Sequence, residues 1–249
     1  MSDNVSVGTS APPAETGSDN LVSRFVGVIF SPKDTFAKIV ARPRWVGALA
    51  VVTLVVATLS FAFLSTEVGQ SAWLDQQVRQ TEAFSGQVTE EQYKQFESIA
   101  PMVAYFGGGF TLVLVPVMTL VLSGVLLGIF NALLGGSASF RQVAAVLSHA
   151  GAISILQQLF LFPLNYARQS MSSATNLGLL VPFLDEGNLI ARFLGTIDLF
   201  IIWNLLVTSI GLAVLYRRRT ASIFWSFMAV YVVIALVIAL VMRGASGGA

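Results

Sequence analysis

Five long apolar stretches limit what this chain can fold into. Each is about 18 residues or longer, which is the length at which an α-helix can cross the hydrocarbon core of a bilayer. They cover residues 46–64, 102–130, 143–162, 190–216 and 222–242. We therefore predict an all-α fold, a polytopic membrane helical bundle with five transmembrane helices preceded by a short interfacial helix.

Composition agrees with a membrane chain and leaves little for chemistry. Hydrophobic residues make up 55% of the 249 residues and charged residues 11%, against about 25% charged in soluble domains. The chain has no cysteine and a single histidine, His149, so thiol nucleophiles and the usual multi-ligand zinc site are excluded. HExxH, GxSxG and phosphate-loop motifs are also missing. We expect no enzyme activity, no cofactor, no metal and no nucleic-acid partner.

The composition divides the chain into four parts. Residues 1–20 are rich in Ser, Gly, Pro, Ala and acids, which predicts a disordered cytoplasmic tail. Residues 21–45 mix cations with apolar residues and predict an amphipathic interfacial segment. Residues 46–243 form the five-helix membrane domain, and residues 244–249 a short tail.

The amphipathic segment contains a helix start. Ser31 stands at the N-cap position and Pro32 at the first helical position, and Phe36, Ile39 and Val40 then fall on one face. We expect this helix to lie along the cytoplasmic surface of the membrane, although the segment could also be a plain flank of the first span. The expected interfacial anchors are Phe36, Arg42, Arg44 and Trp45.

Charge predicts the orientation. With a cytoplasmic N-terminus, the inner segments hold nine of the fourteen Lys and Arg residues. The loop of residues 65–101, with six acids and two bases, then lies outside. The positive-inside rule favours this arrangement, with the C-terminus outside, in a plasma (inner) membrane. The nine cations are Arg24, Lys33, Lys38, Arg42, Arg44, Arg141, Arg217, Arg218 and Arg219.

The two outer loops differ in pattern. In residues 65–101, Thr89 and Gln92 resemble a capping box, and we expect two short helices broken near Gly86. Whether these helices form a lid or a solvated connector stays open. The loop of residues 163–188 carries Ser, Thr, Asn and Gly and is expected to be partly irregular.

Packing residues are concentrated in the second span. Gly124 and Gly128 have GxxxG spacing, which lets another helix approach closely, and Pro116 is expected to kink the helix. We expect the glycines to pack inside the bundle. A homodimer face and a flexing gate are the alternatives.

Polar side chains within the spans form the candidate site. Asp198 interrupts an apolar span, and an acid there needs protein, water or a partner around it. With antiparallel third and fourth spans, Asp198 lies level with Gln157 and Gln158 near the outer end, whereas His149 lies nearer the cytoplasmic end. We expect amide or hydroxyl donors from neighbouring spans, Gln157 or Gln158 first, to hold Asp198, and Asn204 to extend the same polar face. A structural role remains the alternative for each, His149 above all.

Three segments resemble the Yip1 domain family in its bacterial form. They are VGVIFSPKDTF before the first span, GGSASFRQVAAVLSHA entering the third, and IIWNLLVTSIGLAVLYRRR closing the fourth. The resemblance covers most of Phe25–Met242 and implies a five-helix membrane domain without known catalysis. Eukaryotic members of that family bind Rab-type GTPases, but the DLYGP-type and YGLP-type motifs associated with them are missing here.

Two functional hypotheses follow. The first is a non-catalytic scaffold or adaptor that contacts the lipid bilayer and other membrane proteins, with a homo-oligomer as a further option. The second is a transport component for an ion, a small solute or a lipid, using the polar residues within the spans. Small-residue packing motifs and the lack of internal repeats favour the first hypothesis.

Overall fold

The computed structural model describes residues 20–184 and 188–245, and this part of the chain is almost entirely helical. Five helical segments are long and apolar enough to cross a membrane, which confirms the predicted fold class. The spans are α3 (Trp45–Leu64), α6 (Val103–Leu127), α7 (Phe140–Ala150) with α8 (Ala152–Arg168), α10 (Leu199–Tyr216) and α11 (Thr220–Ala245). The predicted tails lie outside the described residues, except Asn20, Gly244 and Ala245.

Two short helices precede the first span and contribute to the core. They are α1 (Leu21–Phe30) and α2 (Pro32–Ala41), joined at Ser31. α2 packs on α10 and α7, and the side chains of Phe36 and Ile39 are fully buried. The expectation that Phe36 anchors the chain in the membrane interface is therefore wrong. Its ring contributes to the core of the bundle instead.

Trp45, Arg42 and Arg44 stay near the start of the first span. Trp45 opens α3 and packs, partly buried, against the same core. Arg42 follows the last residue of α2, and Arg44 immediately precedes α3. These two arginines thus border the end of the bundle at which α3 begins, where an interfacial role stays a prediction.

The third span is interrupted at Gly151, between α7 and α8. A Cβ atom at this position would lie 2.9 Å from both Cγ atoms of Val52 on α3. Glycine therefore allows α3 and the α7–α8 pair to approach closely there. Residues of α7, α10 and α2 form much of the main hydrophobic core.

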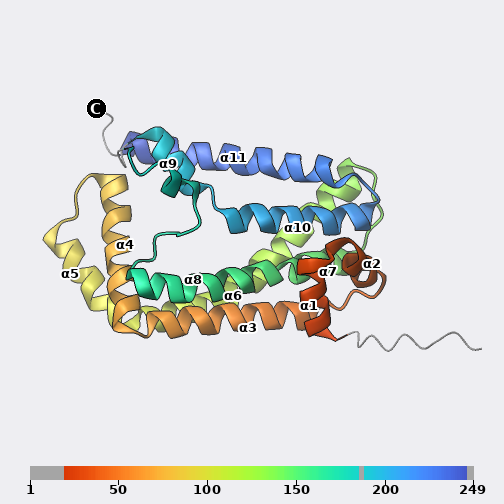
Figure 1. Cartoon of the computed structure of the whole chain (residues 1–249), viewed down its shortest axis with the longest axis horizontal. Helices are drawn as coiled ribbons and strands as arrows, with labels where there is room; N and C mark the ends of the chain where they lie inside the picture. The colour runs from red at the N-terminus through yellow and green to blue at the C-terminus, as the bar shows by residue number, and fades with distance from the viewer. Residues whose placement is uncertain (1–19, 185–187, 246–249) are drawn as a thin grey trace, which may run out of the picture.

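The segment after α3 forms two helices across one end of the bundle. α4 (Glu67–Ser85) runs from the end of α3 toward α11, and α5 (Glu90–Ile99) leads back to α6 (Figure 1). The predicted break is confirmed, because Gly86 ends α4 with φ at +81°. The predicted capping box is also present, with Gln92 N donating to Thr89 Oγ1 at 3.2 Å and Thr89 N donating to Gln92 Oε1 at 3.0 Å.

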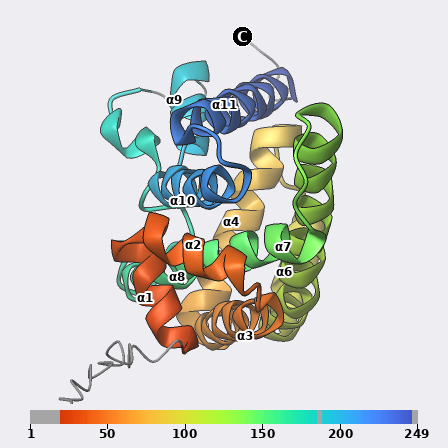
Figure 2. The same cartoon turned by 90° about the vertical axis from the view of Figure 1, so that its right-hand side faces the viewer.

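The two ends of the bundle differ in structure. α1, α2, the α6–α7 connection and the α10–α11 turn lie at one end, and α4, α5 and α9 (Leu189–Thr196) at the other (Figure 1). We call these the cationic end and the α4 end, since the nine cations counted above lie in α1 and α2, between α2 and α3, in the first turn of α7 and in the α10–α11 turn. Viewed along the spans, α6 forms one edge of the bundle (Figure 2).

α6 continues through Pro116 and changes to a π-helix, η2 (Gly128–Leu133), at the cationic end. The ring of Phe130 stacks on Tyr216 with centroids 4.6 Å apart. In addition, Arg218 Nη2 donates to the carbonyl of Leu134 at 2.6 Å. These contacts fasten the end of α6 to the turn between α10 and α11.

Candidate functional site

Asp198 lies at the start of a span and not inside it. The helix expected over residues 190–216 is divided into α9 and α10, and Asp198 has extended backbone angles between them (φ −109°, ψ 134°). Its Oδ1 accepts hydrogen bonds from Phe200 N at 2.8 Å and Ile201 N at 3.4 Å. Asp198 is thus the N-cap of α10, a position that suits a carboxylate because the first N–H groups of a helix have no partner within it.

The second carboxylate oxygen binds two hydroxyl groups. Oδ2 accepts from Ser173 Oγ and from Thr175 Oγ1, each at 2.6 Å, and Asp198 is 6% exposed. Both donors belong to the loop after α8. The expected partnership with Gln157 and Gln158 is wrong, because this loop returns to the α9–α10 joint and supplies its own donors.

Backbone groups complete the site around Asp198. The hydroxyl of Tyr231, on α11, accepts from Asp198 N at 2.9 Å and donates to the carbonyl of Thr196 at 2.9 Å. The loop also pairs with the α9–α10 joint in a short antiparallel bridge between Asn176 and Asp198. In this bridge, Leu177 N donates a hydrogen bond to the Ile197 carbonyl at 2.9 Å. We call Asp198, Ser173, Thr175 and Tyr231 the Asp198 cluster. It joins the loop, the α9–α10 joint and α11 near the α4 end.

The two glutamines and His149 lie elsewhere. Gln158 Nε2 donates to Ser60 Oγ at 2.8 Å and so links α8 to α3, and Gln157 is half-buried beside it on α8. His149 is fully buried, with Nδ1 2.8 Å from the Ala145 carbonyl oxygen and its ring 5.9 Å from Phe25. Since a carbonyl only accepts, this bond fixes a proton on Nδ1. His149 and Asp198 are separate, as the depth argument predicted.

Asn204 lies on α10, facing the joint between α7 and α8. Its Nδ2 donates to the Ala150 carbonyl at 3.4 Å, and its Oδ1 accepts from Thr208 Oγ1 at 3.3 Å. Both distances are long for hydrogen bonds, so the amide is held weakly. The candidate residues therefore lie in four separate places, those of Asp198, the two glutamines, His149 and Asn204, and do not form one polar site.

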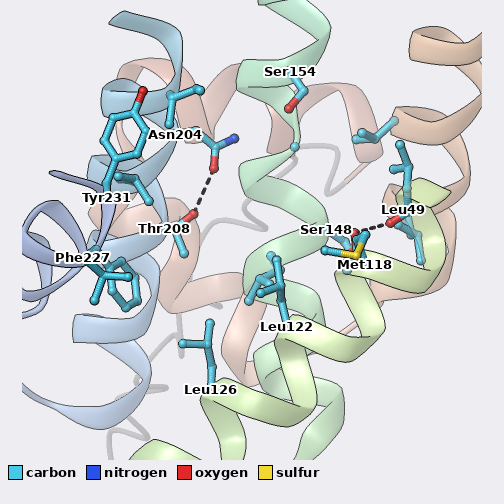
Figure 3. Close-up of a pocket in the computed structure, with 18 of the residues that line it drawn as sticks. Leu49, Met118, Leu122, Leu126, Ser148, Ser154, Asn204, Thr208, Phe227 and Tyr231 are labelled. Carbon is cyan, nitrogen blue, oxygen red and sulfur yellow. Dashed lines mark hydrogen bonds between the residues drawn. The ribbon is translucent and has the colours of Figure 1, made fainter. Parts of the chain in front are cut away.

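Asn204 and Thr208 line a cavity of about 590 Å³, which we call the α6–α11 pocket (Figure 3). One wall comes from α6, including Met118, Leu122 and Leu126, and another from α11, including Phe227 and Tyr231. Ser148 and Ser154, from the third span, complete the lining together with residues of α3. Most of the lining is apolar, and no lining residue is charged. Sequence reasoning did not identify this pocket.

The GxxxG glycines of α6 face outward. Gly124 and Gly128 are exposed, and a Cβ atom at either position would meet nothing within 4 Å. The expectation that these glycines pack inside the bundle is therefore wrong. They continue an exposed row with helical spacing, the α6 outer stripe, whose members are Phe106, Phe110, Val113, Val117, Val121, Gly124 and Gly128.

The described residues offer no cluster of three or more His, Cys, Asp or Glu side chains that could hold a metal ion. The Asp198 cluster contains one carboxylate, and its side-chain hydrogen-bond partners Ser173, Thr175 and Tyr231 are uncharged. A charged ligand would compete there with the bonds that already cap α10.

Comparison with known families supports the reading of the fold. The family model of the Yip1 domain matches residues 26–242, which is most of the chain. The chain belongs to the Yip1 domain family. Comparisons with curated proteins and with solved structures give no match.

In this Yip1-domain protein, sequence reasoning missed the donors of Asp198. One signal was present, since an Asp directly before the apolar run LFIIW is a typical N-cap pattern. The Ser and Thr residues at positions 173 and 175 carried no comparable signal, because their loop has no periodicity that places it beside α10. Tyr231 is likewise one of several aromatic residues in an apolar helix.

Proposed function

We propose that this Yip1-domain protein is a non-catalytic membrane adaptor that binds a spanning helix of another membrane protein along the α6 outer stripe. The observation that carries the proposal is the exposure of α6. Only 6% of the residues in the most apolar part of this span are buried, whereas 33% are buried in α3 and in α10.

The shape of the stripe fits a second helix. Its members follow one another at intervals of three or four residues, so they form one continuous face along the helix. The two phenylalanines lie toward the α4 end, and the two glycines lie at the cationic end. Exposed glycines four residues apart allow close backbone approach by a partner helix, which is a common way for helices to associate in membranes.

A polar transport path has less support. Asp198 is occupied in capping α10, His149 is enclosed in the core, and Asn204 lies in a third place. A relay of protons or ions needs such groups to be connected. We therefore favour the adaptor, with the cationic end in the cytoplasm of a cell with an inner membrane, as the positive-inside rule predicts.

Site-specific photocrosslinking tests the proposal, because the chain has no cysteine of its own. A cysteine at Val121, on the stripe, is modified with a benzophenone in intact membranes, and products are identified by mass spectrometry. A cysteine at Val237, exposed on α11, is the control. We expect Val121→Cys to capture a defined membrane protein and Val237→Cys to capture none. A product of two copies of this chain, or equal products at both positions, would overturn the proposal.

A further inference from the structure

The α6–α11 pocket has features that the adaptor role does not use. It lies on the other side of α6 from the outer stripe: Leu122 lines the pocket and Gly124 belongs to the stripe. Two positions correspond to about 200° around a helix, so the two surfaces point away from each other. A partner helix on the stripe would leave the pocket accessible.

Ser148 gives the pocket an unusual polar group. Several hydroxyl side chains in the spans donate to the carbonyl four residues earlier, as Ser123 does to Thr119 at 2.6 Å and Ser209 to Leu205 at 2.6 Å. The Ser148 hydroxyl makes no such bond. Although Ser148 is only 2% exposed, its Oγ has no hydrogen-bond partner in the described part of the chain. Buried polar groups without partners are rare and call for an explanation, such as a ligand.

Asn204 and Thr208 add further capacity to the same cavity. Figure 3 shows their mutual hydrogen bond on the side of the pocket opposite Ser148 and Met118. The amide is held only by contacts of 3.3 and 3.4 Å, so it can also bond with a ligand. A bound molecule would therefore meet neutral donors and acceptors on both sides and an apolar surface elsewhere.

The size of the pocket limits the occupant. A volume of about 590 Å³ lies within the range of about 300–1,000 Å³ that is usual for sites that hold one small ligand. A spanning helix, about 10 Å wide and about 30 Å long, has roughly four times this volume and does not fit. The pocket therefore suits a single slender molecule and not a protein segment.

The charge and position of the pocket determine its chemistry. Because no lining residue is charged, an ionised group would lose its hydration without gaining a counter-charge. The walls come from α6 and α11, whose other faces are exposed at bilayer depth, and these two helices do not pack extensively on each other in the described residues. A molecule that is already dissolved in the bilayer can therefore enter from the side.

We propose that the α6–α11 pocket binds an uncharged single-chain lipid of the monoacylglycerol class. Its acyl chain lies along the apolar walls of α6 and α11. Its ester or hydroxyl group bonds with Ser148 Oγ and with the amide of Asn204. The lipid gives the buried serine hydroxyl the partner that the protein does not supply.

The test uses the full chain in phosphatidylcholine nanodiscs with a monoacylglycerol that carries a diazirine in its chain. The comparison ligand is the free fatty acid with the same diazirine chain, which is ionised near neutral pH. We expect labelling by the monoacylglycerol on peptides of α6, α7 or α11, and weaker labelling by the fatty acid. Equal labelling by both, or labelling spread over all exposed helices, would overturn the proposal.

Two pairs of variants locate the site. Leu122→Trp fills the pocket from its exposed wall and should abolish labelling, whereas Val121→Trp, on the stripe, should leave labelling unchanged. Ser148→Ala should weaken labelling by about tenfold, the effect of one neutral hydrogen bond. Thr53→Val is its control, because Thr53 Oγ1 is also buried without a partner but lies outside the pocket lining. Equal labelling of Leu122→Trp and Val121→Trp would show that the lipid does not occupy the α6–α11 pocket. Equal labelling of Ser148→Ala and Thr53→Val would show that it does not bond with Ser148.

The same variants separate this inference from the adaptor role. With the crosslinker on a cysteine at Val117, another exposed member of the stripe, Val121→Trp should disturb crosslinking of a partner and spare the lipid, and Leu122→Trp should do the reverse. Thermal unfolding followed by circular dichroism checks that each variant is folded. Both positions are about half exposed, so a larger side chain need not enter the core.

Discussion

At the scale of single residues, the carboxylate of Asp198 connects parts of the chain that are far apart in sequence. One oxygen caps α10, and the other holds Ser173 and Thr175 in the loop after α8. The backbone N–H of the same residue bonds to Tyr231 on α11. Each polar group has a partner of the right kind, so burial of the acid is compensated by hydrogen bonds.

Replacing Asp198 tests this structural role. Asp198→Ala removes the N-cap and leaves two hydroxyl groups without their acceptor, which should lower the free energy of unfolding by about 2–4 kcal/mol. Asp198→Asn should cost less, because asparagine also caps helices and the hydroxyl groups can rotate to accept from its amide. Thermal unfolding in detergent measures both. The control is Asp75→Ala on the exposed face of α4, expected to change stability by less than about 0.5 kcal/mol.

If Asp198→Ala and Asp75→Ala have the same small effect, Asp198 does not hold the joint together. A variant Asp198→Asn that is stable but inactive in the cell would instead indicate that the charge itself is needed. The two results differ in what they measure, so each role can be judged separately.

Asp198 also shows what the sequence could and could not predict about a single residue. An acid among apolar residues correctly indicated a residue that needs partners. Its depth was derived from one continuous helix, however, and the break at Ile197 and Asp198 moved it to the end of the span. Because the helix is divided there, Asp198 does not lie level with Gln157 and Gln158 as one continuous helix predicted.

At the scale of elements, α2 packs closely on α10 at Gly211. A Cβ atom at Gly211 would lie 2.5 Å from Val146 Cγ1 and 3.1 Å from two atoms of the Phe36 ring. The missing side chain of Gly211 thus makes room for α2 and α7 at the same point. The amphipathic pattern predicted the helix but not its location, because lipid tails and a protein core are similarly apolar.

Two glycine substitutions distinguish an internal contact from an external one. Gly211→Ala should lower the free energy of unfolding by about 1–3 kcal/mol, the usual cost of overpacking. Gly124→Ala should leave it unchanged or raise it by up to about 1 kcal/mol, since alanine favours helices and the site is open. Thermal unfolding of the purified protein compares the two, and equal effects would contradict the assigned faces of α6 and α10.

A larger side chain at Gly124 tests partner binding. Gly124→Ile should prevent close approach of a helix at the stripe and so remove the crosslinked product at Val121, while the purified chain stays folded. An unchanged product would show that the partner does not use the glycine end of the stripe.

At the scale of the whole molecule, hydropathy and span length were enough to predict five membrane helices and the fold class. They could not tell which face of each helix turns to lipid. That choice depends on packing between helices, and in a bilayer the hydrophobic effect does not separate protein-facing from lipid-facing side chains. For this reason the outward direction of Gly124 and the α6–α11 pocket emerged only from the three-dimensional arrangement.

At the scale of the whole molecule, charge also predicts how the bundle is oriented. The nine cations of the predicted inner segments lie at the cationic end, the end where α1, α2 and the α10–α11 turn lie in Figure 1. The positive-inside rule predicts that this end lies in the cytoplasm. Single cysteines are introduced at exposed positions in a chain without native cysteine and labelled in intact cells with a membrane-impermeant maleimide. Ser137→Cys and Ala221→Cys, at the cationic end, should be labelled only after lysis, and Ser98→Cys and Ser172→Cys, at the α4 end, before it. The reverse pattern would place the cations outside, and labelling of all four positions before lysis would show that the cells leak.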